Sequence, residues 1–279
     1  MNTTDPVVNE AAVTNTTIDT FHRDGAVVLR GVFSDWISVL QDGVEENMAA
    51  PGEFGKVYTS DNEEGHFFGD YCNWQRIQPY RDFLFNSSAG EIVAQLVDSN
   101  SVSIFHEHVL VKEPGTARKT PWHHDLPYYC VDGAQLCSLW IPLDPVDKSV
   151  CPEFIAGSHR WGQTFLPTKF SGIAYERPGE DHATLPDIDA ARQDYNILSW
   201  DLQPGDAIAF YYTTVHGAPE NLSNQRRRGF SARMMGDDAV FAQRSGEISP
   251  PFPGLEQELK PGEPMHTPLF PQVYPRSNT

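Results

Sequence analysis

The sequence predicts a mainly β protein, a sandwich or barrel of short strands with helices packed against it. From residue 101 the pattern changes to that of strands, with Val102, Ile104, His106 and His108 on one face and Phe105, Glu107 and Val109 on the other. Turn signals such as Asp132-Gly133 and Pro204-Gly205 separate the later strand candidates. Short strands that are spaced by turns favour a sandwich or barrel over parallel βαβ units.

Each element is expected from its local pattern. Ser and Asp cap the start of a helix and Gly can end one, and these signals predict helices over residues 17–25, 34–48 and 88–97. Strands are predicted over residues 26–30, 102–109, 135–143, 153–156, 196–202, 207–212 and 229–235. Residues 51–85 are unusually aromatic and show no clear period, so we expect a largely irregular segment there.

All 279 residues are expected to form a single domain, because no Gly/Ser linker or block of charge divides the chain. Residues 1–15 are polar and are expected to form a loose N-terminal arm. Residues 246–279 are rich in proline and are expected to wrap around the body as an extended tail.

Composition limits the partners. The formal net charge of −18 disfavours nucleic acid and anionic membrane surfaces as partners. The N-terminus lacks the features of a secretory signal, and no apolar run approaches the roughly 20 residues of a membrane span. The four cysteines form no CxxC pair, which favours free thiols. Together these features predict a cytoplasmic protein that acts on a small molecule; they make no prediction of oligomeric state.

A metal site is predicted from three residues. His123 and Asp125 are two positions apart, so an extended strand would project both from one face. His216, in a later segment of mixed apolar and aromatic residues, is the best candidate for a third ligand. Two histidines and one carboxylate on one face leave other coordination positions open, as in non-haem Fe(II) oxygenases. His124 should point the other way, and it is expected either to support the metal ligands from behind or to act in packing.

A run of three arginines follows His216. Alternate residues on a strand share a face, so Arg227 is expected to point inward with Gly229 and Ser231. Arg226 and Arg228 would then lie on the solvated face. An inward guanidinium can bind a carboxylate through two parallel hydrogen bonds, which suggests a co-substrate with a distal carboxylate.

Other polar and aromatic residues are candidates for the same cavity. His106 and His108 share a strand face. We expect one of them to hydrogen-bond a ligand rather than both to bind metal, and His108 is the candidate. Trp140 is expected in the core or at the border of the cofactor site, and His159 in a structural turn. The aromatic candidates for the substrate pocket are Phe67, Phe68, Trp74, Tyr128 and Tyr129.

Several short segments resemble one known family. They are Leu110-Val111-Lys112-Glu113-Pro114-Gly115, Pro121-Trp122-His123-His124-Asp125, Ser138-Leu139-Trp140-Ile141-Pro142-Leu143-Asp144, Ala156-Gly157-Ser158-His159-Arg160-Trp161, Pro204-Gly205-Asp206 and His216-Gly217-Ala218. In their order along the chain and in their residues, these segments resemble the phytanoyl-CoA dioxygenase family of Fe(II)/2-oxoglutarate-dependent oxygenases. The resemblance covers roughly residues 15–240.

The resemblance implies a double-stranded β-helix, or jelly-roll, core with Fe(II), 2-oxoglutarate and O2 as reagents and succinate and CO2 as by-products. It implies that Arg227, eleven positions after His216, binds 2-oxoglutarate. The presence of Asp125 favours hydroxylation over halogenation. The chain departs from the family pattern at Ala218, where serine is common, and over residues 150–153.

The sequence therefore predicts an Fe(II)/2-oxoglutarate-dependent dioxygenase that hydroxylates a small organic molecule, with a free small molecule favoured over an acyl-CoA thioester. The aromatic content of residues 54–85 favours a neutral or cationic substrate held by ring faces. The same cofactors could instead support oxidative cyclisation, desaturation or epimerisation. A jelly-roll binding protein without turnover is the alternative from another class, and conversion of 2-oxoglutarate to succinate would exclude it.

Overall fold

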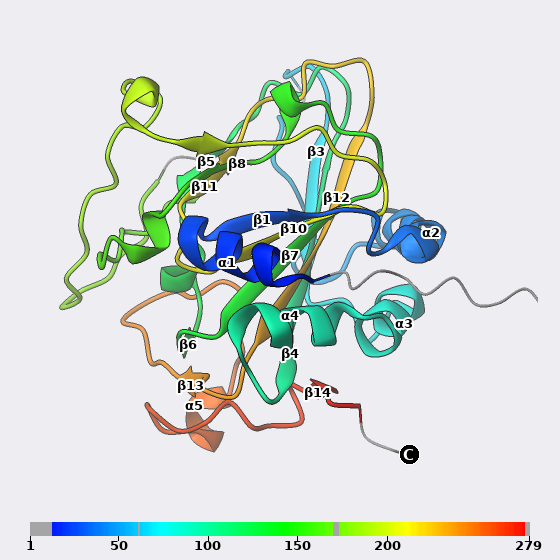
Figure 1. Cartoon of the computed structure of the whole chain (residues 1–279). Coiled ribbons are helices and arrows are strands. Elements are labelled where there is room, and N and C mark those ends of the chain that lie inside the picture. The colour runs from blue at the N-terminus through cyan, green and yellow to red at the C-terminus, as the bar shows by residue number, and fades with distance from the viewer. Residues whose placement is uncertain (1–12, 61, 170–172, 277–279) are drawn as a thin grey trace, which may run out of the picture.

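Two antiparallel sheets form the framework of the chain in the computed structural model, which describes residues 13–60, 62–169 and 173–276 (Figure 1). The larger sheet has the order β1-β10-β7-β12-β4-β3-β2, and β14 also pairs with β4. Its strands are β1 (Ala26–Leu29), β2 (Lys56–Val57), β3 (Phe67–Tyr71), β4 (Val102–Lys112), β7 (Leu136–Pro142), β10 (Ala207–Tyr211), β12 (Arg227–Met235) and β14 (Gln272–Tyr274).

The smaller sheet has the order β5-β11-β8-β9, and a separate pair joins β6 to β13. These strands are β5 (Thr120–His123), β6 (Val131–Asp132), β8 (Glu153–Ile155), β9 (Ile197–Leu198), β11 (His216–Ala218) and β13 (Val240–Phe241). The predicted mainly β fold is confirmed, and the pairings between named strands are antiparallel.

The main helices lie on one side of the larger sheet (Figure 1). They are α1 (Asn15–Asp24), α2 (Ile37–Ala49), α3 (Gln78–Asn86) and α4 (Ala89–Val97). The Thr14 side chain caps α1 by accepting a hydrogen bond from the amide of Thr17 at 3.2 Å. Gly25 ends α1 with a φ of 82°, a left-handed conformation that glycine adopts without a Cβ clash.

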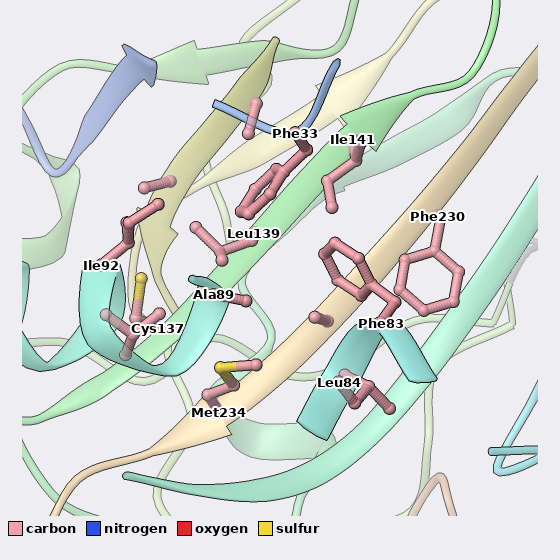
Figure 2. Close-up of a cluster of buried hydrophobic side chains, with 14 of the residues drawn as sticks. Phe33, Phe83, Leu84, Ala89, Ile92, Cys137, Leu139, Ile141, Phe230 and Met234 are labelled. Atoms are coloured by element: carbon pink, nitrogen blue, oxygen red, sulfur yellow. The ribbon is translucent and has the colours of Figure 1, made fainter. Parts of the chain in front are cut away.

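Strand β7 divides its side chains between two cores. Leu139 and Ile141 point to the helices and pack beside Phe83 of α3 and Phe230 of β12 (Figure 2). Trp140 lies between them in sequence and points to the opposite face, where it joins a second core with Phe154 and Phe210 of the two sheets. The face of the larger sheet that the helices do not cover therefore faces the smaller sheet.

The segment expected to be irregular contains regular structure. Residues 56–57 and 67–71 form β2 and β3, and residues 78–86 form α3. Tyr80, Phe83 and Leu84 of α3 are buried in the core under the larger sheet. The aromatic residues that suggested an irregular face are thus partly the buried side of a short helix.

The C-terminal segment is not simply extended, and the predicted N-terminal arm lies mostly outside the described residues. Residues 1–12 of the predicted N-terminal arm lie outside the described residues, and α1 already begins at Asn15. In the C-terminal segment, α5 (Leu255–Glu258) is a single helical turn and β14 pairs with β4. The four cysteines are free thiols. Among the described residues, the model contains no helix with the length and apolarity that crossing a membrane requires.

Candidate active site

Three side chains converge between the two sheets. His123 at the end of β5 and His216 at the start of β11 are opposite each other in the strand register. The Nε2 atoms of these histidines lie 3.6 Å and 3.9 Å from Oδ1 of Asp125. The three ligand atoms lie within 4.8 Å of one another, which is compatible with a single metal ion held between them. The structure thus brings together the three residues proposed as metal ligands.

The orientation of both imidazoles fits a metal site. The Nδ1 atom of His123 donates to the carbonyl of Pro121 at 2.7 Å, and that of His216 donates to the carbonyl of Thr214 at 2.9 Å. A carbonyl can only accept, so each neutral ring keeps its lone pair on Nε2, which points toward Asp125. A hydrogen bond of this kind commonly fixes the tautomer of a metal-bound histidine. Burial lowers the pKa of His216 to about 3, so its ring is neutral over the ordinary pH range.

Asp125 reaches the site by a different route from the one expected. Strand β5 ends at His123, and Asp125 follows it with the backbone angles of a helical turn, φ −73° and ψ −35°. Its amide donates to the carbonyl of Tyr212 at 2.8 Å, which anchors the turn beside β10. The prediction of a shared strand face is therefore wrong for Asp125, although the residues still meet.

A buried arginine that the sequence interpretation did not single out supports Asp125. The Nε atom of Arg233 lies 3.4 Å from Oδ2 of Asp125, and the Oγ of Ser138 donates to the same oxygen at 3.4 Å. Burial alone raises the pKa of Asp125, but Arg233 and the two histidines together hold that pKa well below its usual value. The carboxylate is therefore charged, as a metal ligand must be.

The alternation expected along β12 is present. Arg227, Ser231 and Arg233 line the same cavity, and Gly229 lies against Trp140 on the same face. A Cβ at Gly229 would lie 2.5 Å from Nε1 of Trp140, so only glycine leaves room for the indole. His108 is opposite Ser231 in the strand register and also lines the cavity. The structure thus brings His108, Trp140, Ser231 and Arg227 to one wall.

Arg227 and Lys112 are neighbouring buried basic residues. They are opposite each other on β12 and β4, and each is less than a tenth exposed. Arg227 donates to the carbonyl of Val150, and Lys112 donates to the carbonyl of Pro219 at 3.0 Å. Neither side chain forms a salt bridge within the described part of the chain. Burial, reinforced by the charge of Arg227, lowers the pKa of Lys112 to about 6.

The arginines on either side of Arg227 point away from the cavity. Arg226 forms salt bridges with Glu45 and Glu113, at 2.9 Å and 2.7 Å. Arg228 pairs with Asp144 at 2.6 Å and is only 14% exposed, so it joins β12 to a neighbouring loop and to α2 rather than pointing freely into solvent. The strand register that selects Arg227 as the inward residue is therefore correct.

The cavity has a volume of about 440 Å³, which is ample for a small organic ligand. Tyr128 and Tyr129 line it as proposed, together with Phe54, Tyr71 and Tyr175, which the sequence interpretation did not select. Residues 247–251 of the C-terminal segment complete one side of the wall.

Three of the aromatic candidates lie elsewhere, and their placement in the cavity is corrected. Phe68 and Trp74 pack in the core between the helices and the larger sheet. Phe67 is fully buried against Tyr58 and lies under the Lys112 amine. The sequence identifies these residues as large and apolar but does not specify which surface they cover.

The remaining histidines have distinct surroundings. His124 is buried, and its Nε2 atom accepts a hydrogen bond from the amide of Phe165 at 3.0 Å, away from the metal site as expected. His159 stacks on Tyr211. His106 and His108 each have one ring nitrogen, Nδ1 and Nε2 respectively, without a partner among the described residues.

Comparison with known proteins agrees with this geometry. Residues 21–229 match the family model described as phytanoyl-CoA dioxygenase (PhyH). A phytanoyl-CoA dioxygenase of Arabidopsis thaliana is 24% identical over 164 residues, covering 57% of this chain and 53% of the relative. The match thus spans about half of that relative's length. The dioxygenase cdmD of Talaromyces verruculosus is 25% identical over 240 residues, covering 76% of this chain and 70% of the relative.

Solved structures share the fold. The non-haem α-ketoglutarate-dependent carbocyclase SnoK from nogalamycin biosynthesis has a TM-score of 0.72 at 20% identity and covers 94% of this chain and 96% of its own. The epimerase SnoN, solved with Fe3+, α-ketoglutarate and nogalamycin RO, has a TM-score of 0.72 at 22% identity, with 92% and 97% coverage. EctD from S. alaskensis, solved with 2-oxoglutarate and 5-hydroxyectoine, has a TM-score of 0.67 at 18% identity, with 93% and 90% coverage.

These likenesses confirm the jelly-roll fold implied by the motifs, and the family model covers most of the chain. The chain belongs to the phytanoyl-CoA dioxygenase family of Fe(II)/2-oxoglutarate-dependent oxygenases.

Proposed function

We propose that this chain is an Fe(II)/2-oxoglutarate-dependent dioxygenase that hydroxylates a small organic molecule in the 440 Å³ cavity. Such an enzyme uses O2 and converts 2-oxoglutarate to succinate and CO2 while it oxidises its substrate. The observation that carries the proposal is the convergence of His123, Asp125 and His216 on one point of a cavity that also contains the buried Arg227.

The donor set fits Fe(II). Two imidazole nitrogens and one carboxylate oxygen suit non-haem iron and leave coordination positions open toward the cavity. The bound iron would supply the site at which O2 and the 2-oxo acid react. The backbone carbonyls of Pro121 and Thr214 hold the two rings in place, and Arg233 holds the carboxylate.

The basic residues Arg227 and Lys112 fit the distal end of 2-oxoglutarate. Arg227 has terminal nitrogens that can bind a carboxylate, and Lys112 can add a further donor beside it. Ala218 lies at the same wall and offers no hydroxyl. A serine at position 218 would donate a hydrogen bond to the co-substrate. We propose that Lys112 is the donor that replaces it here. His108, Ser231 and Trp140 border the same space as further contacts.

Oxidative cyclisation, desaturation and epimerisation are the alternative outcomes. The structural likeness to proteins named as a carbocyclase and an epimerase is as high as the likeness to EctD, so these chemistries are a second candidate function. The mass of the product distinguishes them. Hydroxylation adds one oxygen atom, cyclisation or desaturation removes two hydrogen atoms, and epimerisation leaves the mass unchanged.

A metabolite screen tests the proposal. The purified protein with Fe(II), O2 and 2-oxoglutarate is incubated with fractions of a cell extract, and succinate is measured in each fraction. We expect at least one fraction to stimulate succinate formation, with a product that gains one oxygen atom. An Asp125→Ala variant is the control and should form no succinate above background. A stimulated reaction that persists in this variant would contradict the assignment of the metal site.

A further inference from the structure

We infer that Arg233 forms a second carboxylate-binding subsite in the cavity, and that the substrate oxidised by this protein is a small organic anion. The inference rests on the proposed function, because it assigns the prime substrate of that same site. The observations that support it concern the unused nitrogens of Arg233, the histidines around it and the balance of charge in the cavity.

Arg233 is buried but incompletely bonded. The residue is only 6% exposed and lines the cavity. Its Nε atom donates to the hydroxyl of Tyr129 and lies beside Asp125, which leaves the two terminal nitrogens of the guanidinium. Neither terminal nitrogen has a hydrogen bond within the described residues, and Nη1 is fully buried. The donors of a buried guanidinium normally have hydrogen-bond acceptors. The two terminal nitrogens of Arg233 without a partner therefore indicate that an acceptor is missing.

Two histidines add unsatisfied nitrogens to the same area. His106 is opposite Arg233 in the register of β4 and β12, and His108 is one alternate position further along β4. Nδ1 of His106 and Nε2 of His108 are buried without a partner among the described residues. Each neutral ring has one N–H and one unprotonated nitrogen. All three side chains line the cavity, and the two histidine rings pack against the rings of Tyr71 and Tyr129 there.

The charges of the loaded site explain why an anion is required. A divalent iron ion, the Asp125 carboxylate, the 2-oxoglutarate dianion and the Arg227 guanidinium together carry no net charge. Lys112 has a pKa of about 6 in the free protein, and any proton that the bound dianion adds to it makes the loaded site more positive still. Arg233 then remains as one unmatched buried cation. The other acidic residue at the wall, Glu247, pairs with Lys169 at 2.8 Å. An unmatched buried charge is costly, and a substrate carboxylate would neutralise it.

The position of Arg233 separates this subsite from that of the co-substrate. Arg227 and Arg233 are six residues apart on one strand face, which corresponds to about 20 Å along β12. Arg233 lies beside the metal ligand Asp125, at the opposite end of the strand from Lys112. A carboxylate on Arg233 would therefore keep the rest of a small substrate close to the metal. A second carboxylate of 2-oxoglutarate is the competing occupant of this subsite, and the experiment distinguishes the two.

The test compares acids with their amides. The protein is loaded anaerobically with Fe(II) and saturating 2-oxoglutarate, and binding is measured by calorimetry for acetate, phenylacetate and benzoate and for acetamide, phenylacetamide and benzamide. We expect at least one acid to bind at least about 30-fold more tightly than its amide, the ratio that corresponds to about 2 kcal/mol. Acids that bind no more tightly than their amides would overturn the inference, and this comparison needs no variant.

Variants assign the preference to a residue. Arg233→Gln should remove the preference for the acid, whereas Arg226→Gln should keep it, because Arg226 precedes β12 and pairs with Glu45 and Glu113 outside the cavity. An acid preference that survives Arg233→Gln would overturn the inference, because the anion would then sit elsewhere. A loss of 2-oxoglutarate affinity in Arg233→Gln, without a change in acid binding, would assign the guanidinium to the co-substrate and also overturn it. Failure of the wild-type protein to bind 2-oxoglutarate with Fe(II) is a separate result, which refutes the proposed function.

Discussion

At the scale of single residues, the most informative contrast is between Arg227 and Arg233. Both lie on the inward face of β12, and both are predicted to do so by the same alternation along the strand. Only Arg227 was selected from the sequence, because it lies in a run of arginines at the family's spacing from His216. Arg233 stands alone before two methionines, so its burial beside Asp125 became visible only in the structure.

Asp125 is expected to be important for stability as well as for metal binding. It is 2% exposed and carries the charge that faces Arg233, so Asp125→Ala leaves a buried cation without its partner. We expect loss of tight Fe(II) binding together with a decrease in the free energy of unfolding of about 3–5 kcal/mol. Calorimetry with Fe(II) and denaturant unfolding of the metal-free protein measure the two effects. Asp19→Ala, at an exposed position in α1, is the control, and equal effects in both variants would refute the prediction.

Arg227 is expected to determine co-substrate affinity. Its guanidinium faces the cavity, whereas that of Arg226 pairs with Glu45 and Glu113 outside it. Removing a buried charged partner costs about 2–5 kcal/mol, so Arg227→Ala should weaken 2-oxoglutarate binding by at least about 30-fold. Anaerobic titration of the iron-loaded protein measures this change. A larger loss in Arg226→Ala than in Arg227→Ala would show that the wrong arginine has been assigned.

Lys112 is expected to make co-substrate binding depend on pH. Its pKa is about 6 in the free protein because of burial and the neighbouring Arg227, and a bound dianion should raise this pKa. Between the free and bound pKa values the complex holds more protons, so affinity should decrease as pH rises above about 6. Calorimetry in buffers of different ionisation enthalpy should detect proton uptake on binding. Lys112→Met should abolish that uptake, and uptake that persists in this variant would exclude Lys112 as its source.

At the scale of elements, the sequence predicted strands and helices well where the periodicity was regular. The helices before β1 and β4 and the long strands β4, β7 and β12 lie close to their expected positions. The secondary structure of residues 51–86 was difficult to predict. Strand β3, Phe67–Tyr71, is short and mostly buried on both faces, so apolar and polar residues do not alternate along it. Helix α3 begins with Gln78-Pro79 and has no capping side chain. The residues that usually mark the start of a helix in a sequence are therefore missing there.

The contact between β12 and β7 yields a prediction at this scale. Gly229 is the position where β12 makes room for the indole of Trp140, so Gly229→Ala should displace that ring from the cavity wall. We expect a loss of stability of about 1–3 kcal/mol and weaker 2-oxoglutarate binding. Thermal unfolding and anaerobic calorimetry measure the two effects. Gly162→Ala, where a Cβ has open space but φ is +66°, should lower stability without changing affinity, and the same behaviour at Gly229 would contradict the role assigned to it.

At the scale of the whole molecule, the charge of the chain and the charge of the cavity have opposite signs. The net charge is −18, yet the described residues of the cavity wall include Lys56, Lys112, Lys169, Arg227 and Arg233 and only two acidic residues, Asp125 and Glu247. Net charge describes the long-range field and says little about a pocket a few ångströms across. The sequence could therefore limit the class of partner. Its aromatic content favoured a neutral or cationic substrate, whereas the basic residues of the cavity wall favour an anion.

The negative field should still matter for large polyanions. Coenzyme A carries several phosphate charges, and a thioester would have to hold them outside a cavity of about 440 Å³ on an acidic surface. We expect free coenzyme A and an acyl-CoA to show no saturable binding at about micromolar concentration, the level of ordinary substrate recognition. Competition binding against the iron- and 2-oxoglutarate-loaded protein measures this. Succinate release that a thioester stimulates and its free acid does not would contradict the expectation.

The central claim is that one metal ion and one 2-oxoglutarate share the site formed by His123, Asp125, His216 and Arg227. Anaerobic calorimetry of 2-oxoglutarate binding, with and without Fe(II), tests it most directly. The claim predicts one co-substrate per chain, with binding that is strong only when iron is present and is lost in His216→Ala. Equal affinity with and without iron, or unchanged affinity in His216→Ala, would contradict it.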